Sequence, residues 1–196
     1  MLKSGITLYY VRHGETDWNA ARRLQGQTDT LLNDIGRAQA RRNGEALRDA
    51  LGDPSRFDFI SSPMKRTSET MEIVREAIGL ERGGCRFDAR LREIHFGHWE
   101  GRTWLELPDV DPQEYAARRR DAYRWRPRGG ESYADVAERV AEWLATVERD
   151  AVVVSHGGVS RVLRGLVLGL TPEEIAELPV PQDRVLLLKD GAASWL

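Results

Sequence analysis

The chain has 196 residues, of which 41% are hydrophobic and 31% are charged, as in an ordinary globular protein of one domain. Its net charge of −2 does not suggest a nucleic-acid or membrane partner, and no apolar stretch is long enough to span a bilayer. The single cysteine, Cys85, excludes a disulfide framework and a thiolate metal cluster. The first residues do not resemble a signal peptide, so we expect a cytoplasmic protein.

Apolar runs predict four strands along the chain and a hairpin at its end. The predicted strands are residues 5–11, 57–62, 85–91 and 151–155, and the hairpin covers residues 184–196. The first strand, "GITLYYV", is apolar almost throughout, which is typical of a central strand that is covered on both faces.

Helices are predicted between these strands. The first follows an N-cap at Asn33, the second covers residues 63–79 with a proline at its first position, and others cover residues 132–150 and 158–168. Ser132 is expected to cap its helix through a capping box. The buried stripe of the first helix is expected to contain Ile35, Ala38, Leu47 and Leu51, interrupted by Gly36 and Gly44.

Strands that alternate with helices imply an α/β fold with a sheet covered on both faces. Residues 101–130 interrupt this alternation and are predicted to be an irregular insert, rich in arginine and tryptophan, near the functional site. Ligands of such sheets bind beyond the carboxyl ends of the strands. Four segments bring polar residues to that edge, and these residues are Arg12, His13, Asn19, Arg66, Glu93 and His156.

This set of residues suits a phosphate ester. Arginine pairs with phosphate oxygens through two parallel hydrogen bonds, and glycines such as Gly14, Gly157 and Gly158 let backbone N–H groups approach an anion. The sequence contains neither a P-loop nor a dinucleotide glycine fingerprint. A neutral histidine can attack phosphorus, and Glu93 could protonate the leaving oxygen. The residues alone leave open which histidine is the nucleophile.

Four blocks of sequence together resemble the histidine phosphatase superfamily, also called the phosphoglycerate mutase-like family. In chain order these blocks are "RHGETDWN", "SSPMKRTSET", "LREIHFGHWEG" and "SHGG". The resemblance extends over nearly the whole chain. It implies a three-layer α/β/α sandwich with a mostly parallel central sheet, formed by residues 1–196 as a single domain with the insert at about 101–130.

The resemblance also implies roles for individual residues. His13 matches the histidine that becomes phosphorylated, and Glu93 matches the proton donor. Four residues match those that hold the phosphoryl group: Arg12, Asn19, Arg66 and His156. Gln25 and Gly26 match a loop that borders the substrate, and Gly157 is expected to contact it through its backbone. The family needs no metal, we expect no cofactor for this chain, and homodimers are common in the family.

Three local patterns have other interpretations. His95 and His98, near Glu93 and Glu100, could form a metal cluster, although their spacing does not match a known helical metal motif. Ser155 beside His156 could suggest a serine hydrolase, but adjacent strand residues point to opposite faces. The arginines between residues 118 and 128 either coat a solvated helix or bind a second anionic group of the substrate.

The expected function is hydrolysis of phosphate monoesters of small metabolites, without a metal, through a phosphohistidine. A cofactor-dependent phosphoglycerate mutase is the alternative, because both activities share the nucleophile. Ile94 and Phe96 stand where mutases typically have arginine and tyrosine, and the short insert also favours the phosphatase branch, which includes enzymes that dephosphorylate alpha-ribazole phosphate. A non-catalytic phosphate-binding protein is a third alternative, but such a protein would be expected to lack His13 or Glu93.

Overall fold

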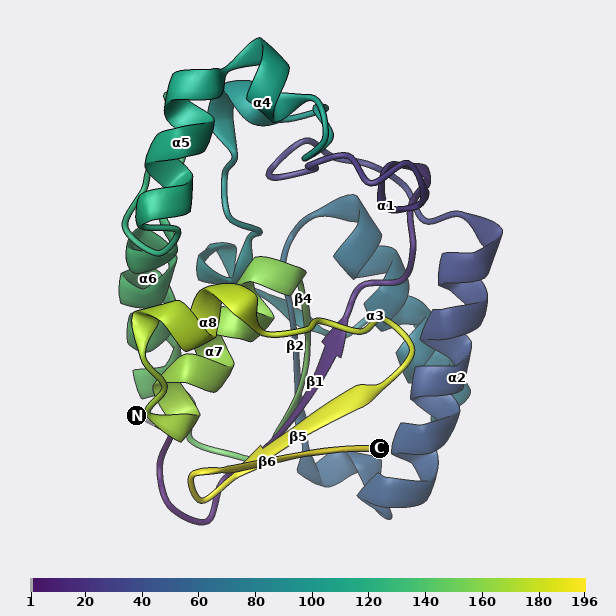
Figure 1. Ribbon diagram of the computed structural model, residues 1–196. Helices are drawn as coiled ribbons and strands as arrows, with labels where there is room; N and C mark the ends of the chain where they lie inside the picture. Colours follow the sequence, from purple (N-terminus) through teal and green to yellow (C-terminus); the bar gives the residue numbers. More distant parts are fainter. Residues whose placement is uncertain (1) are drawn as a thin grey trace.

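The computed structural model describes residues 2–196, and within them six strands form one sheet in the order β3-β2-β4-β1-β5-β6 (Figure 1). The strands are β1 (Thr7–Arg12), β2 (Asp58–Ser61), β3 (Arg86–Phe87), β4 (Ala151–Ser155), β5 (Val185–Lys189) and β6 (Ala192–Trp195). Strands β1 to β4 pair in parallel, whereas β5 and β6 form an antiparallel hairpin beside β1. The predicted α/β class and mostly parallel sheet are therefore confirmed.

Helices cover both faces of this sheet, in the three-layer arrangement that was predicted. The helices are α1 (Asp17–Ala20), α2 (Asp34–Leu51), α3 (Lys65–Ala77), α4 (Leu107–Val110), α5 (Pro112–Arg120), α6 (Tyr133–Ala145), α7 (Gly157–Leu168) and α8 (Pro172–Glu177). Alternate residues of β1 enter opposite cores: Leu8 and Tyr10 pack with α6 and α7, and Tyr9 and Val11 pack with α2 and α3. Burial on both faces explains why this strand is apolar almost throughout.

The buried stripe of α2 contains Leu47 and Leu51 as predicted, but it differs from the prediction at the start of the helix. Ile35 is 57% exposed and Ala38 is exposed, whereas Gly36 and Gly44 are buried. A Cβ atom at Gly44 would lie 2.5 Å from the Cβ atom of Ala77, so only glycine lets α2 approach α3 this closely. The glycines do not interrupt the stripe; they are the part of it that allows close packing.

Other boundaries also shift for local reasons. Pro63 lies before α3 and not at its first position, because Met64 is the N-cap. The predicted strand at residues 85–91 is only two residues long, since the chain turns into the 3₁₀ helix η2 (Ala89–Leu91). By contrast, Ser132 and Asp135 form the expected capping box at α6.

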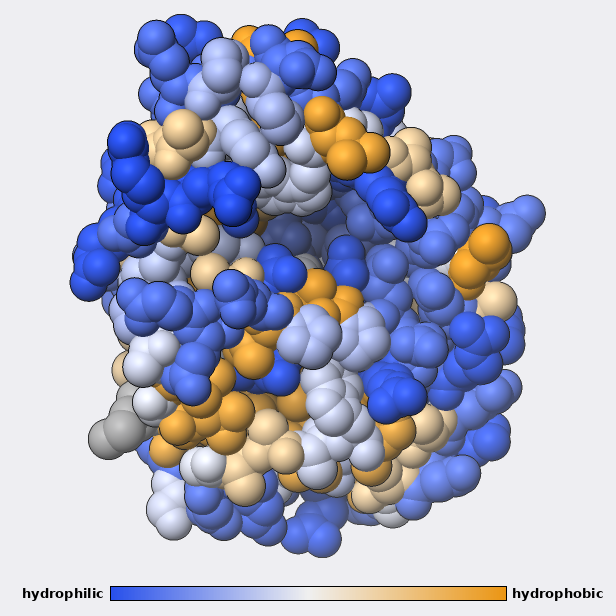
Figure 2. All heavy atoms as spheres, viewed as in Figure 1, coloured by the Kyte–Doolittle hydropathy of each residue, from blue (hydrophilic) through white to orange (hydrophobic). Residues whose placement is uncertain are grey.

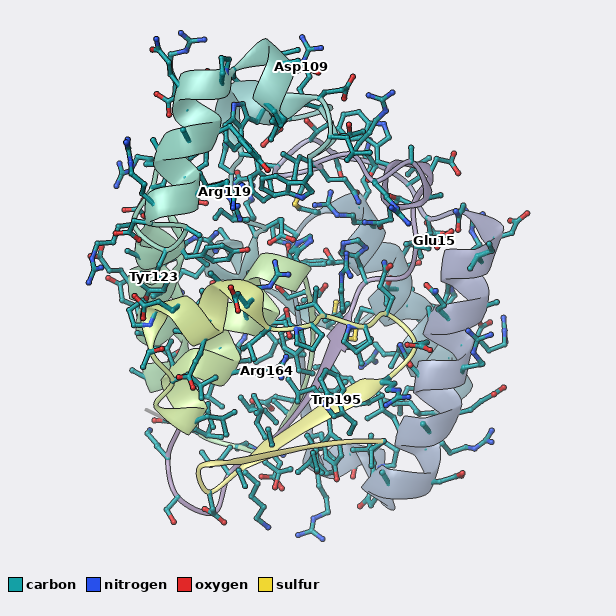
Figure 3. All side chains as sticks on the ribbon, in the orientation of Figure 1. Glu15, Asp109, Arg119, Tyr123, Arg164 and Trp195 are labelled. Atoms are coloured by element: carbon teal, nitrogen blue, oxygen red, sulfur yellow. The ribbon has the colours of Figure 1, made fainter. Side chains whose placement is uncertain are left out.

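The insert is more ordered than predicted, because it contains α4 and α5, at the top of Figure 1. Asp109 and Arg119 mark these two helices in Figure 3. Aromatic side chains form a small core beneath them, in which the rings of Trp99 and Trp125 stack 4.2 Å apart. This packing gives a polar, arginine-rich segment a fixed position. Within residues 2–196, no helix combines the length and the apolar character needed to cross a bilayer.

Candidate active site

The pairing of β1 with β4 brings His13 and His156 together, although 143 positions separate them in the sequence. Arg12 is in register with Ser155, and the N–H of His13 donates to the carbonyl of Ser155 at 2.9 Å. Each histidine follows its strand directly, so both emerge at the carboxyl edge of the sheet. Their ring centroids are 5.2 Å apart in an edge-to-face arrangement. The two histidines are therefore close enough to act on one ligand.

A pocket of about 300 Å³ opens at this edge, and a hollow is visible near the centre of Figure 2. Eight of the nine predicted site residues line it: Arg12, His13, Asn19, Gln25, Gly26, Arg66, Glu93 and Gly157. The exception is His156, which is completely buried and is not among the lining residues. The sequence thus predicts eight residues of one pocket from five separate segments, whereas His156 lies beneath the lining with its ring 5.2 Å from that of His13.

Two guanidinium groups are held in this pocket by backbone carbonyls. Arg66 donates from Nη1 to the carbonyl of Thr28 and from Nη2 to that of Gly26, both at 2.8 Å. Arg12 donates from Nη1 to the carbonyl of Val180 at 2.6 Å. Because these acceptors are uncharged, they hold the arginines without cancelling their positive charge. An anion entering the pocket therefore meets two fixed cations.

The hydrogen bonds of His13 determine which of its nitrogens is free to react. Nδ1 lies 2.8 Å from the carbonyl of Gly14, which can only accept, so the proton is on Nδ1. The other nitrogen, Nε2, accepts a long hydrogen bond of 3.3 Å from Nε of Arg66. Nε2 is therefore unprotonated and carries a lone pair, as a nucleophile must.

Burial keeps this imidazole neutral. Desolvation, followed by the charges of Arg66 and then Arg12, holds the pKa of His13 well below its ordinary value of 6.5. The hydrogen bond with Gly14 opposes this shift only in part. The same effects, again led by desolvation, lower the pKa of His156. Both rings are therefore neutral near pH 7, which suits a nucleophile at His13.

His156 lies behind His13 and is fixed from two sides. Its Nε2 lies 2.8 Å from the hydroxyl of Ser62, and its carbonyl accepts a hydrogen bond of 2.6 Å from the hydroxyl of Tyr10. Within residues 2–196, Nδ1 of His156 and Nε of Arg12 are buried without a hydrogen-bond partner. Buried polar atoms without partners are rare, and a ligand-binding site is one place where they occur.

Glu93 presents one carboxylate oxygen to the pocket. Its other oxygen, Oε1, accepts hydrogen bonds from the N–H groups of Ile94 at 2.9 Å and Gly158 at 3.0 Å. A Cβ atom at position 158 would lie 2.6 Å from this oxygen, so the approach requires glycine. With Oε1 fixed by two donors, Oε2 is the oxygen that can carry a proton toward a substrate.

Asn19 is oriented so that it can donate to an anion. Its Oδ1 accepts from the N–H and hydroxyl of Thr16, both at 3.2 Å, and from Nε2 of Gln182 at 3.3 Å. These three donors fix the position of the oxygen. The amide nitrogen is left as a hydrogen-bond donor at the pocket, as the predicted role requires.

Gln25 and Gly26 line the pocket as predicted, and the loop that contains them is held by Glu100, which the sequence suggested only as a possible metal ligand. Glu100 accepts from the N–H of Gln27 at 2.9 Å and from the N–H and hydroxyl of Thr28 at 3.1 and 2.6 Å. Gly26 has a φ of 51°, and a Cβ atom there would collide with Glu100. Glu100 therefore positions the two carbonyls that hold Arg66.

Comparison with known proteins agrees with this geometry. A family model described as the histidine phosphatase superfamily (branch 1) matches residues 8–194. The chain belongs to the histidine phosphatase superfamily. The resemblance carried by the four sequence blocks is thereby confirmed.

The relatives of the chain are named for two activities. A glucosyl-3-phosphoglycerate phosphatase of Mycolicibacterium vanbaalenii is 38% identical over 83% of this chain and 74% of its own length. A "Probable phosphoglycerate mutase GpmB" of Salmonella paratyphi C is 35% identical over 96% and 83%. The structure of a mycobacterial glucosyl-3-phosphoglycerate phosphatase in complex with VO3 has a TM-score of 0.79 at 32% identity, covering 98% of this chain and 97% of that one.

Several pocket residues were not anticipated as members of the site. They are Arg22, Arg23, Leu24, Tyr133, Arg161 and Val180. Arg161 could have been found, because it lies one helical turn after Gly157 and therefore on the same face of α7. Val180 lies in a connection between α8 and β5 that has no motif, so no sequence signal points to it.

The structure also separates the groups that suggested other chemistry. His95 lies 3.1 Å from Glu100, whereas His98 lies 2.6 Å from Asp111. Within residues 2–196, no three potential metal-ligating side chains lie together. The hydroxyl of Ser155 donates to the carbonyl of Leu91 and does not contact the ring of His156, as alternation along the strand predicts.

The lowered histidine pKa values predict how stability depends on pH. Below pH 6.5 the histidines of the unfolded chain take up protons, whereas buried His13 and His156 stay neutral. The unfolded state then binds more protons, so stability decreases as pH falls from 7.5 to 5.5, by up to about 1.4 kcal/mol per pH unit for each group. Denaturant unfolding of the wild type at several pH values measures this slope.

The matched variant is His13→Asn, which removes one of the two groups. Its slope should be shallower than that of the wild type below pH 6.5, while above pH 7.5 both slopes should be alike. An unchanged slope in the variant would show that His13 titrates equally in the folded and unfolded states, against the burial argument.

Proposed function

We propose that this chain hydrolyses phosphate monoesters of small metabolites through a phosphohistidine at Nε2 of His13, without a metal ion. The observation that carries the proposal is the unprotonated Nε2 of a neutral imidazole beside the guanidinium groups of Arg12 and Arg66. Glu93 lines the same pocket and supplies an acid. The phosphatase names of relatives at 38% identity support the reaction class. The expected cytoplasmic location and homodimer remain predictions.

In the first step, the phosphoryl group binds to Arg12, Arg66 and the amide nitrogen of Asn19, with the N-terminus of α7 beside it. Nε2 of His13 attacks phosphorus as the ester P–O bond breaks. Protonated Glu93 gives its proton to the leaving oxygen, so the alcohol departs neutral. The fixed cations stabilise negative charge that develops on the phosphoryl oxygens.

In the second step, Glu93, now a carboxylate, removes a proton from water as that water attacks phosphorus. The P–N bond breaks, its electron pair returns to Nε2 of His13, and orthophosphate leaves. Glu93 ends protonated and His13 ends neutral, so both residues return to their starting states.

The names of relatives also suggest a substrate class. Glucosyl-3-phosphoglycerate is the substrate named for the 38% identical relatives, so phosphorylated sugar acids and their glycosides are the first compounds to test. A phosphoglycerate mutase is the second candidate, because relatives named for that activity match 96% of the chain. Ile94 and Phe96 line the pocket with apolar side chains, which favours the phosphatase.

The central test is hydrolysis of p-nitrophenyl phosphate with excess chelator. We expect turnover by the wild type to persist with chelator, and His13→Asn to lose activity by a factor of at least ~10³, since no other group forms the intermediate. His98→Asn is the matched control, because His98 does not line the pocket, and this variant should retain activity. Loss of wild-type turnover with chelator would contradict the metal-free mechanism, and an active His13→Asn variant would contradict the nucleophile.

Glu93→Gln tests the acid, because glutamine keeps a carbonyl oxygen for the N–H groups of Ile94 and Gly158 but cannot supply the proton. We expect activity on an alkyl phosphate to fall roughly a hundredfold, and activity on an aryl phosphate to fall much less, because a good leaving group needs little protonation. Equal losses on both substrates would show that Glu93 is not the acid.

The choice between phosphatase and mutase depends on what accepts the phosphoryl group. With 3-phosphoglycerate and 2,3-bisphosphoglycerate present, we expect release of orthophosphate to exceed formation of 2-phosphoglycerate. Measuring both products in one reaction decides the matter. Interconversion faster than phosphate release would make the mutase the correct function.

A further inference from the structure

The pocket contains more positive charge than one phosphoryl group requires. Arg12 and Arg66 lie beside the proposed nucleophile, and Arg22, Arg23 and Arg161 also line the pocket. Among the lining residues of the described chain, Glu93 is the sole carboxylate. A phosphate monoester carries a charge of about −1.5 to −2 near pH 7, which the two inner arginines balance. Within residues 2–196, no ion pair joins Arg22 or Arg161 to a carboxylate, whereas the charge of Arg23 acts on Glu106.

Arg161 is fixed at the pocket wall but is not neutralised there. Its Nε donates to the carbonyl of Leu178 at 2.8 Å, and its Nη1 donates to the hydroxyl of Tyr133 at 2.9 Å. Both acceptors are uncharged. The charge of Arg161 also contributes to the lowered pKa of Arg12, which places the two guanidinium groups near each other. Arg161 is thus a held cation next to the inner phosphate site.

Arg22 lies in the chain after α1, far in sequence from Arg161, and its backbone has an unfavourable conformation. Its φ is 55°, in the left-handed region that non-glycine residues seldom adopt. Within residues 2–196 its exposed side chain has no ion pair and no hydrogen bond; only its backbone N–H is bonded, to the carbonyl of Asn19. Unfavourable backbone conformations cluster at functional sites, where they position a side chain.

We propose that Arg22 and Arg161 form an outer subsite that binds a second anionic group of the substrate, a carboxylate or a second phosphate. The natural substrates are then phosphate monoesters that carry a further acidic group. This inference rests on the proposed phosphatase function. The aromatic side chains of Phe96, Trp104 and Tyr133 line the same pocket and contact the uncharged part of the substrate.

The arginine-rich segment does not line the pocket, although burial and the nearby charge of Arg161 lower the pKa of Arg118. Arg118 lies with its guanidinium 4.2 Å from the ring centroid of Trp104, and Arg119 and Arg120 are exposed on α5. None of these three residues lines the pocket. The arginines that line the pocket beside the inner phosphate site are instead Arg22, in the chain after α1, and Arg161, in α7.

Two pairs of substrates test the proposal. In the first pair, glycerol 3-phosphate has a hydroxymethyl group where 3-phosphoglycerate has a carboxylate. In the second pair, 3-hydroxypropyl phosphate has a hydroxyl group where 1,3-propanediol bisphosphate has a second phosphate. We expect the wild type to favour the more acidic member of at least one pair by tenfold or more in kcat/KM, mainly through KM. A preference only for 3-phosphoglycerate over glycerol 3-phosphate identifies the second group as a carboxylate. A preference only for 1,3-propanediol bisphosphate over 3-hydroxypropyl phosphate identifies it as a phosphate.

Arg22→Asn and Arg161→Gln should each bring this ratio closer to one. Asparagine tolerates a positive φ, so Arg22→Asn should keep or raise Tm while it loses discrimination, an outcome that a purely structural role does not predict. Arg42→Gln on α2, an exposed arginine remote from the pocket, is the matched control and should keep the wild-type ratio.

The outcomes separate the two proposals. A wild type that hydrolyses p-nitrophenyl phosphate but shows no preference within either pair would overturn the outer subsite and leave the phosphatase intact. An Arg22→Asn variant that retains the full wild-type ratio would also overturn the outer subsite. This variant leaves the contacts of Arg161 with Leu178 and Tyr133 in place. If the wild type released phosphate from none of these esters, both the phosphatase function and the outer subsite would be overturned.

Discussion

Uncharged backbone carbonyls hold the buried guanidinium groups of the pocket, and the chemistry of the site depends on this. Arg66 donates to Gly26 and Thr28, and Arg12 donates to Val180. A carboxylate partner would have fixed an arginine equally well, but it would have cancelled the charge that a phosphoryl group needs. Carbonyl acceptors satisfy the hydrogen bonds at little electrostatic cost, so the pocket remains positive.

The same positive charge keeps the proposed nucleophile competent. With burial and two nearby cations, His13 stays neutral, and the carbonyl of Gly14 keeps its proton away from the reactive nitrogen. Glu100, which does not line the pocket, supports this arrangement from behind, because it holds the loop whose carbonyls hold Arg66. Charge, tautomer and position of His13 therefore depend on contacts made by three different segments.

Much of this could be predicted from the sequence, because strand ends have a fixed geometry. Two apolar strands that each end in a histidine meet at one edge when they pair, and motifs place Arg66 and Glu93 beside them. Close approaches could not be predicted: Gly36 and Gly44 interrupt a pattern in the sequence but form the contact surface in space. The positive φ of Arg22 could not be predicted either, because arginine is not a residue type that favours this conformation.

The order of the strands in the sheet has a consequence for how the chain acquires its structure during synthesis. Strand β4 lies between β2 and β1, and β5 lies on the other side of β1. Strand β1 therefore has no hydrogen-bonding neighbour until residues 151–155 have been translated. Until then β1 is an exposed apolar segment with two free edges, which makes it prone to non-native association in the nascent chain.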